Sequence, residues 1–147
     1  MNKMNPVYSI ARVISYALTG QLSFPRQPVG KEFLMDGEKW IIFRQVIIKP
    51  GKNQPAVPGA IFVPRFHVAN MSIRQNIRFS LLPMWFIIGL PGFRSKLWMY
   101  NPQNGDSAGF YEWDTVQDAE NYSKSFAVTF MTRRSVPGSV SFRIIPK

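Results

Sequence analysis

Residues 93–113 read FRSKLWMYNPQNGDSAGFYEW, and this stretch decides the fold. Its first eight residues alternate between two chemically different sets, which is typical of a strand with two unlike faces. The segment NPQNG at 101–105 predicts a hairpin turn, because Asn104-Gly105 suits positions that need a positive φ. Residues 107–113 are then the returning strand. The stretch therefore predicts a β-hairpin at the centre of a sheet.

The segment before this hairpin adds a strand and a helix. Residues 60–68 (AIFVPRFHV) are a strand candidate, and Pro64 predicts that this strand lies at an edge or carries a bulge. Ser72 and Gln75 form a capping box that begins a helix. Pro83 should break or kink that helix. This segment therefore predicts a strand followed by a helix.

The segment after the hairpin adds a second helix and a last strand. Asp114 or Thr115 caps the helix, and residues 140–145 (VSFRII) form the strand. The expected buried face of the helix consists of Ala119, Tyr122, Phe126 and Phe130. From residue 60 onward the order is β-α-β-β-α-β, so the sequence predicts an α+β protein with a ferredoxin-like fold.

An N-terminal helix and an extra strand precede this core. Residues 5–18 place Val7, Ile10, Ile14 and Leu18 on one helical face, and we expect this helix to cover an edge of the sheet or the mouth of the pocket. Residues 40–49 (WIIFRQVIIK) read as a strand that extends the sheet. The Pro- and Gly-rich segment 50–59 is the clearest linker, so we divide the chain into an N-terminal extension (1–57) and a ferredoxin-like domain (58–147).

Composition excludes many kinds of site. The 147 residues include no cysteine and one histidine, which rules out disulfides, thiolate chemistry and metal sites that need two imidazoles. No phosphate-binding or dinucleotide-binding glycine motif is present, and we expect no cofactor. The most apolar run has ten residues, against about 20 for a membrane span. The first twenty residues lack the features of a secretory signal, so we expect a cytoplasmic protein.

The protein is basic, and its charge is unevenly distributed. The formal net charge is +10, and no carboxylate occurs between Glu38 and Asp106. Such a stretch creates a positive field that attracts anionic ligands, lipids or nucleic acid. The alternative is an ordinary solvated basic face that keeps the protein soluble.

Two motifs around the hairpin resemble the dimeric α/β-barrel superfamily, specifically its small monooxygenase type. They are GLPGFRSKLW at 89–98 and GFYEWD at 109–114, followed by DAENY at 118–122. The resemblance covers residues 59–147 and implies a homodimer with a pocket near each sheet. Members of the superfamily range from cofactor-free oxygenases of aromatic or quinol-like substrates to heme-handling proteins.

Four aromatic residues on the hairpin are candidates for substrate binding. Trp98 and Tyr100 share one face of their strand, and Tyr111 and Trp113 share one face of the partner strand. Together they could line an apolar pocket for a planar ligand. The alternative is cross-strand packing, and the strand register decides between the two.

Charged residues on the same strands are further candidates. Arg94 and Lys96 should share the Trp98 face, where both could bind a phenolate or carboxylate or stabilise an enolate, or could reach solvent instead. Glu112 could be a general base, or could pair with Arg143 or Lys96.

His67 is the remaining candidate base. It shares a strand face with Arg65, and it could abstract a substrate proton or act as a single axial heme ligand, or it could be structural. Arg44, inside the strand at 40–49, is another candidate anion contact.

The resemblance implies a cofactor-independent monooxygenase that acts on an aromatic or polyketide-like molecule. In this hypothesis His67 or Glu112 removes a proton, and Arg94 and Trp98 orient the anion. The alternatives are a non-catalytic lipid- or heme-binding protein and an RNA-binding module. Residues 107–113 argue against nucleic acid, because they lack a leading basic residue and include Glu112, which would repel phosphate.

Overall fold

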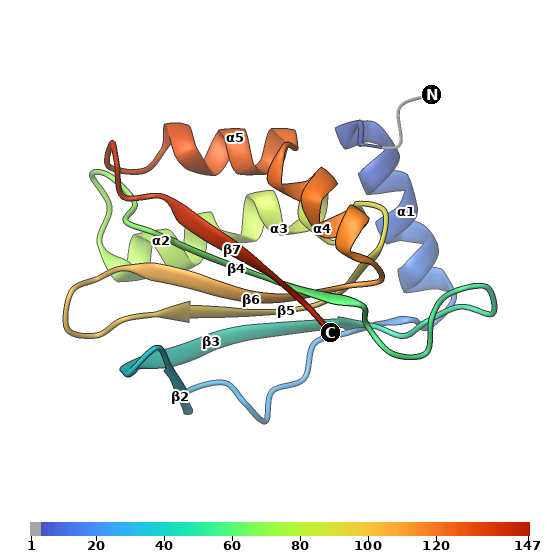
Figure 1. The fold of residues 1–147 in the computed structure, drawn as a ribbon, viewed down its shortest axis with the longest axis horizontal. Coiled ribbons are helices and arrows are strands. Elements are labelled where there is room, and N and C mark those ends of the chain that lie inside the picture. Colours follow the sequence, from blue (N-terminus) through green and yellow to red (C-terminus); the bar gives the residue numbers. More distant parts are fainter. Residues whose placement is uncertain (1–3) are drawn as a thin grey trace.

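A computed structural model describes residues 4–147 of the chain. One antiparallel sheet lies beneath a layer of helices (Figure 1), so the α+β prediction is confirmed. The elements in chain order are α1 (Pro6–Leu18), β1 (Leu22–Ser23), β2 (Glu32–Met35), β3 (Glu38–Ile48), β4 (Ala60–Phe66), α2 (Ile73–Phe79), α3 (Leu81–Ile87), β5 (Phe93–Tyr100), β6 (Ser107–Trp113), α4 (Val116–Ser123), α5 (Phe126–Arg133) and β7 (Ser141–Pro146).

The sheet order confirms the ferredoxin-like prediction. The strands run β1-β3-β5-β6-β4-β7, and β2 also pairs with β3. The central hairpin is β5–β6, with Trp98 opposite Gly109. The extra strand is β3, which pairs with β5, so the N-terminal residues belong to the same sheet. The short strands β1 and β2 were not predicted.

Strand β4 lies inside the sheet rather than at its edge. It pairs with β6 on one side and β7 on the other, so the expectation drawn from Pro64 is wrong. The ladder to β6 has no pair at Val63 or Pro64, while Pro64 lies opposite Phe142 of β7. This gap in one ladder accommodates a residue without an N–H group.

Both helices of the core are interrupted. The first divides into α2 and α3 at Ser80, because Pro83 cannot donate a hydrogen bond to the carbonyl of Phe79. The second divides into α4 and α5 at Lys124 and Ser125, where Ser125 has extended backbone angles. No helix within residues 4–147 is long and apolar enough to cross a membrane.

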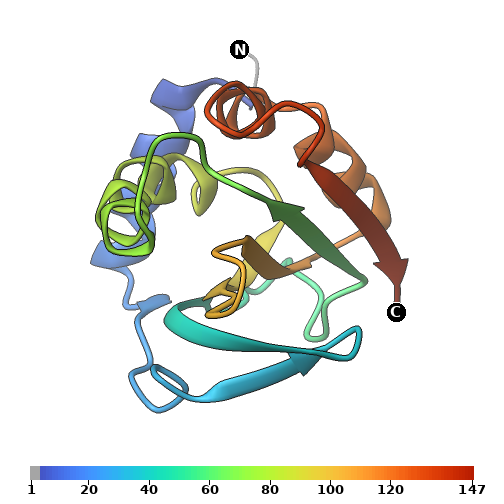
Figure 2. The same ribbon diagram turned by 90° about the vertical axis from the view of Figure 1, so that its left-hand side faces the viewer.

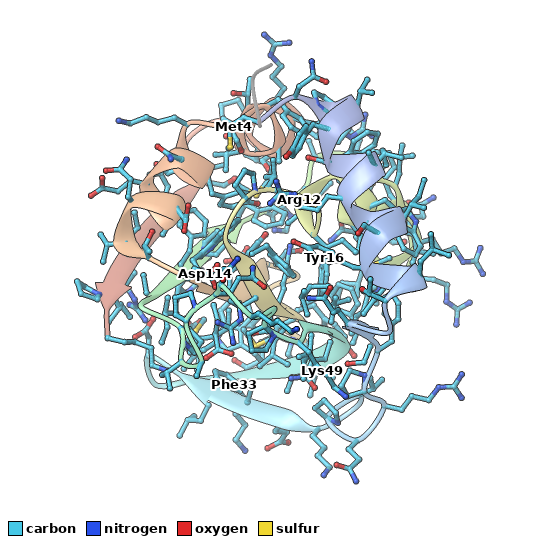
Figure 3. The ribbon with its side chains drawn as sticks, turned by 90° about the vertical axis from the view of Figure 1, so that its right-hand side faces the viewer. Met4, Arg12, Tyr16, Phe33, Lys49 and Asp114 are labelled. Carbon is cyan, nitrogen blue, oxygen red and sulfur yellow. The ribbon has the colours of Figure 1, made fainter. Side chains whose placement is uncertain are left out.

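The predicted apolar face of α1 is largely exposed. Val7, Ile14 and Leu18 are 76%, 55% and 83% exposed, whereas Ser9, a polar residue, is fully buried. The reason is a close approach: a Cβ at Gly89 would lie 2.0 Å from the Ser9 carbonyl oxygen. This contact turns the Ser9 side of α1 inward. Figure 3 shows Arg12 and Tyr16 pointing from α1 toward the body of the molecule.

The sheet has two buried faces, which we call inner and outer. The inner face is covered by helices and includes Phe62, Lys96, Trp98, Tyr111 and Trp113; the outer face includes Ile61, Val63, Leu97, Met99 and Phe110. Strand β3 contributes to both, because a β-bulge lies between Ile42 and Arg44. Trp40 and Ile42 are buried on the outer face, and Val46 and Ile48 on the inner face.

The β2–β3 hairpin folds over part of the outer face (Figure 2). Its turn is Asp36-Gly37, and both residues have positive φ. The Phe33 ring of β2 lies 5.7 Å from the Phe110 ring. Asp36 accepts a hydrogen bond of 3.0 Å from Arg143 of β7. The hairpin is therefore attached to β7, the strand at the opposite edge of the sheet.

Candidate functional site

A small apolar cavity lies between the inner face of the sheet and helices α2, α3 and α5. Its volume is about 70 Å³, and its apolar walls include Phe43, Phe66, Phe79, Ile87, Trp98 and Phe130. The Phe79 and Phe130 rings stack at 5.9 Å, and Phe130 is 39% exposed. A ligand the size of an aromatic ring system requires this aromatic pair to move, because binding pockets usually enclose about 300 Å³ or more.

A chain of buried polar groups lines the sheet side of the cavity. Lys96 is 6% exposed, and its Nζ donates a hydrogen bond to the hydroxyl of Tyr111. The hydroxyl of Tyr122 donates to the same oxygen at 3.1 Å. Among residues 4–147, no carboxylate forms an ion pair with Lys96. We call these three residues the Lys96–Tyr111–Tyr122 chain.

Burial favours the neutral form of all three groups. It lowers the pKa of Lys96 well below the ordinary value of 10.5, and the positive charge of Arg44 lowers it further. Burial raises the pKa of Tyr111 well above 10.0, with a further contribution from Tyr122, and it also raises the pKa of Tyr122. A neutral amine beside a cavity is a base that can accept a proton from a bound molecule.

Arg44 of β3 adds positive charge beside the Lys96–Tyr111–Tyr122 chain. Its guanidinium carbon lies 5.2 Å from the Trp98 ring centroid, and Lys96 Nζ lies 4.3 Å from the same centroid. Arg44 donates hydrogen bonds to Ser80 Oγ at 2.8 Å and to the carbonyl of Ile77 at 3.2 Å. It therefore holds the junction between α2 and α3 against the sheet, and burial lowers its pKa.

Gly109 provides space for the side chains of the Lys96–Tyr111–Tyr122 chain. A Cβ at this position would lie 2.5 Å from Cε1 of Tyr111 and 3.4 Å from Cε of Lys96. A side chain here would displace the Tyr111 ring, so the glycine is needed for the observed geometry.

Two of the four predicted aromatic residues line the cavity. These are Trp98 and Tyr111, both on the inner face. Trp113 shares that face but is fully buried in the core, with its ring 5.6 Å from Phe93. Tyr100 lies outside the cavity and lines a neighbouring hollow.

Arg94 does not line the cavity. It lies at a β-bulge between Phe93 and Ser95. The buried Arg94 guanidinium instead pairs with Asp114 at 3.1 Å and donates to the carbonyl of Ala56 at 3.3 Å. It ties the 50–59 linker to the sheet, away from the cavity.

Glu112 lies on the outer face, opposite to the cavity. It accepts a hydrogen bond of 2.7 Å from Ser95 and one of 3.5 Å from Lys147. Arg143 and Lys96 were the expected partners of Glu112, and neither forms an ion pair with it. Arg143 pairs instead with Asp36 across the outer face.

His67 follows β4, and both His67 and Arg65 contact Asp106. His67 Nδ1 lies 3.0 Å from Asp106 Oδ1. The histidine lines the same hollow as Tyr100, and Asn76 and Ser107 line both this hollow and the cavity. His67 is therefore next to the cavity and not inside it.

The sequence did not identify Tyr122 as a site residue, and it indicated Lys96 and Arg44 only as candidate anion contacts. Alternation did place Lys96 on the Trp98 face. Tyr122 was predicted to be buried, but nothing local shows that its hydroxyl reaches Tyr111, eleven residues earlier. That contact depends on how α4 packs on β6.

Comparisons with known proteins give structural matches only. No protein-family model matches the sequence, and no curated protein matches it. A heme-degrading enzyme from Listeria monocytogenes, LmHde, is 14% identical with a TM-score of 0.57, over 76% of this chain and 72% of that one.

Two further solved structures share the architecture. An uncharacterized ferredoxin-fold protein related to antibiotic biosynthesis monooxygenases, from Listeria monocytogenes 4b F2365, is 13% identical with a TM-score of 0.56, over 80% of this chain and 70% of that one. An anthrone oxidase-like protein is 14% identical with a TM-score of 0.54, over 74% of this chain and 54% of that one. These likenesses establish the ferredoxin-like fold that the resemblance implied, and a fold does not fix a function.

Proposed function

We propose that the chain is a cofactor-independent monooxygenase that acts on a small aromatic or polyketide-like molecule with an acidic hydroxyl or C–H group. The observation that carries this proposal is Lys96, a buried amine without a carboxylate partner beside an apolar cavity. The anthrone oxidase-like and monooxygenase-related neighbours support the substrate class.

In the proposed reaction Lys96 is the base. Its neutral amine takes a proton from the substrate, and the resulting ammonium and Arg44 stabilise the substrate anion. Trp98 and Tyr111 contact the ring of the substrate. The anion reduces O2 to a carbon-bound hydroperoxide, using the proton that Lys96 returns. Loss of water then leaves a carbonyl, so a CH2 group and O2 give C=O and H2O.

This assignment differs from the bases expected from the sequence. Glu112 cannot reach the cavity without crossing the sheet, because it lies on the outer face. His67 lies in the adjacent hollow and is held by Asp106. We therefore place His67 second, as a group that could act on a ligand extending past Asn76 and Ser107.

Oxygen uptake with anthrone tests the proposal. The wild-type protein should accelerate uptake with one O2 consumed per anthraquinone formed. Lys96→Met should reduce the rate about a hundredfold, since loss of a general base costs about that factor or more. Glu112→Gln is the matched control and should retain the rate. The monooxygenase proposal is wrong if anthrone binds without accelerated uptake.

The second candidate is non-catalytic binding of a lipid or heme in the same cavity. The heme-degrading neighbour favours it. Quenching of tryptophan fluorescence by anthrone or by heme in the wild type, much reduced in a Trp98→Phe variant and without oxygen uptake, would support this candidate. In this candidate His67 would bind the heme iron through Nε2, because its contact with Asp106 uses Nδ1.

The proposal also includes a cytoplasmic homodimer. The outer face carries partly buried apolar residues, Ile61, Leu97 and Phe110, and a second copy could bury what the β2–β3 hairpin leaves accessible. Native mass spectrometry measures the subunit number. A monomer would contradict the dimer and leave the cavity chemistry unchanged.

A further inference from the structure

An apolar groove lies on the outside of the helical layer, separate from the Lys96–Tyr111–Tyr122 chain. It runs between the start of α1, helix α3 and helix α5, and its volume is about 340 Å³. Its lining is entirely apolar and includes Pro6, Leu82, Phe86, Phe126 and Phe130. The Phe86 and Phe126 rings meet edge to face at 6.1 Å.

Exposed apolar side chains also lie on the helices that border the groove. Leu81 and Leu82 at the start of α3 are 46% and 59% exposed, and Trp85 one turn later is 38% exposed. Helix α1, which packs against α3, adds the exposed stripe formed by Val7, Ile14 and Leu18. Apolar exposure that is continuous over several elements marks an interaction surface.

The charges on these helices have one sign. Helices α1, α2, α3 and α5 contain no Asp or Glu, and their charged residues are Arg12, Arg74, Arg78 and Arg133. Arg74, Arg78 and Arg133 are exposed. All eight carboxylates of the chain lie in other elements: on β2, the β2–β3 turn, β3, β6, α4 and the loops beside β6.

We propose that this helical face docks on the surface of an anionic phospholipid bilayer. Helices that carry apolar side chains and arginines but no carboxylate fit a surface that offers acyl chains and negative headgroups, and the carboxylates of the helical layer are those of α4. A symmetric contact with a second copy would instead bring the positively charged arginines of the two copies close to one another. Figures 1 and 2 show these helices on the side of the molecule away from the β2–β3 hairpin, which leaves them free to approach a flat surface.

The docking also gives the cavity a route to the bilayer. Pro83, Ala127 and Phe130 line both the groove and the cavity. An apolar ligand dissolved in the membrane would meet these residues first. The docking itself does not depend on the proposed function.

Vesicle co-sedimentation of the full chain tests the proposal. Vesicles of phosphatidylcholine mixed with phosphatidylglycerol should bind the protein at least about tenfold more strongly than phosphatidylcholine alone, and salt should weaken the binding. Leu82→Asp should reduce binding about tenfold. The matched control is Leu34→Asp, which places the same change on β2, where Leu34 is 72% exposed, and should leave binding unchanged.

A second variant separates charge from folding. Arg74→Gln with Arg78→Gln should remove most of the preference for anionic vesicles while the thermal melting curve stays unchanged. Equal binding to both vesicle types, or no binding, would overturn the proposal. It would also be overturned if the wild type were a dimer that Leu82→Asp converts to a monomer, because the face would then be a protein interface.

Discussion

Lys96 and Arg65 lie on opposite faces of one sheet, and their surroundings differ in almost every respect. Arg65 is partly exposed and pairs with both Glu38 and Asp106, and its hydrogen bonds to Glu38 raise its pKa. Lys96 is buried beside a cavity, and its hydrogen bond goes to a tyrosine. Arg65 on the outer face is therefore paired with carboxylates, whereas Lys96 on the inner face has no carboxylate partner among residues 4–147.

This difference separates stability from function. Ion pairs on the outer face attach the β2–β3 hairpin and give that side of the sheet its cover. A buried amine without a counter-ion costs folding free energy, so its presence on the inner face needs another explanation. Binding or chemistry in the cavity supplies one.

Deleting residues 1–57 should have the largest effect, because it removes cover from both faces. Trp40 and Ile42 are buried on the outer face, and Val46 and Ile48 on the inner face. Each contributes about 1.5–3 kcal/mol, and the sum is comparable to the whole stability of a domain. The fragment 58–147 should show no cooperative thermal transition by circular dichroism. A transition at the temperature of the full chain would contradict this.

The pH dependence of stability should report the inner face. The Lys96 pKa is lower in the folded chain than in the unfolded chain, so the unfolded chain binds more protons between these two values. The free energy of unfolding should therefore rise with pH across this window, by up to about 1.4 kcal/mol per pH unit, and level off near pH 10.5.

Above pH 10 the trend should reverse. The pKa values of Tyr111 and Tyr122 are raised on folding, so the unfolded chain loses its tyrosine protons first and stability falls. Urea unfolding at a series of pH values measures both limbs. Lys96→Met should lack the rising limb, and its persistence in that variant would show that another group is responsible.

Lys96→Met should stabilise the protein at neutral pH. It replaces a desolvated amine with an apolar side chain of similar length, and Tyr122 still donates to Tyr111. The gain should be about 1 kcal/mol in urea unfolding. A loss of stability of the same size would mean that the amine is structural.

Arg65→Ala should act in the opposite direction on the outer face. It removes hydrogen bonds to Glu38 and Asp106, but the side chain is 36% exposed and solvent screens the pairs. The expected loss is about 1 kcal/mol, with oxygen uptake unchanged. A change in uptake would show that the two faces are coupled.

Glu112→Gln should have the smallest effect. The pair with Lys147 is long and partly exposed, and the amide can still accept from Ser95. The change in stability should stay within about 0.5 kcal/mol. A larger loss would show that the outer face depends on this carboxylate.

Local signals were sufficient for most of the fold. The NPQNG turn, the Ser72 capping box and the alternation on β5 each report a local conformation, so the β-α-β-β-α-β order follows from them. The β2–β3 hairpin was missed although Asp36-Gly37 is a favoured turn pair. The face of α1 could not be predicted, because a contact with Gly89 sets it.

The site was less predictable than the fold. Trp98 and Tyr111 were found because alternation places them on the inner face. The bulge at Arg94 was not predicted, because such bulges have no strong local signal. The contacts of Lys96 and Arg44 require the register of β3 on β5, which pairs residues about fifty positions apart.

The bulge in β3 has a consequence for how the sequence can diverge. Because Phe43 and Arg44 together occupy the place of one residue, the two halves of β3 face opposite sides only as long as that extra residue is kept. Losing one codon there would turn Val46 and Ile48 toward the wrong side, although no side chain of the strand had been replaced. In descendants of this protein, we therefore expect substitutions along β3 to be far more frequent than changes in its length.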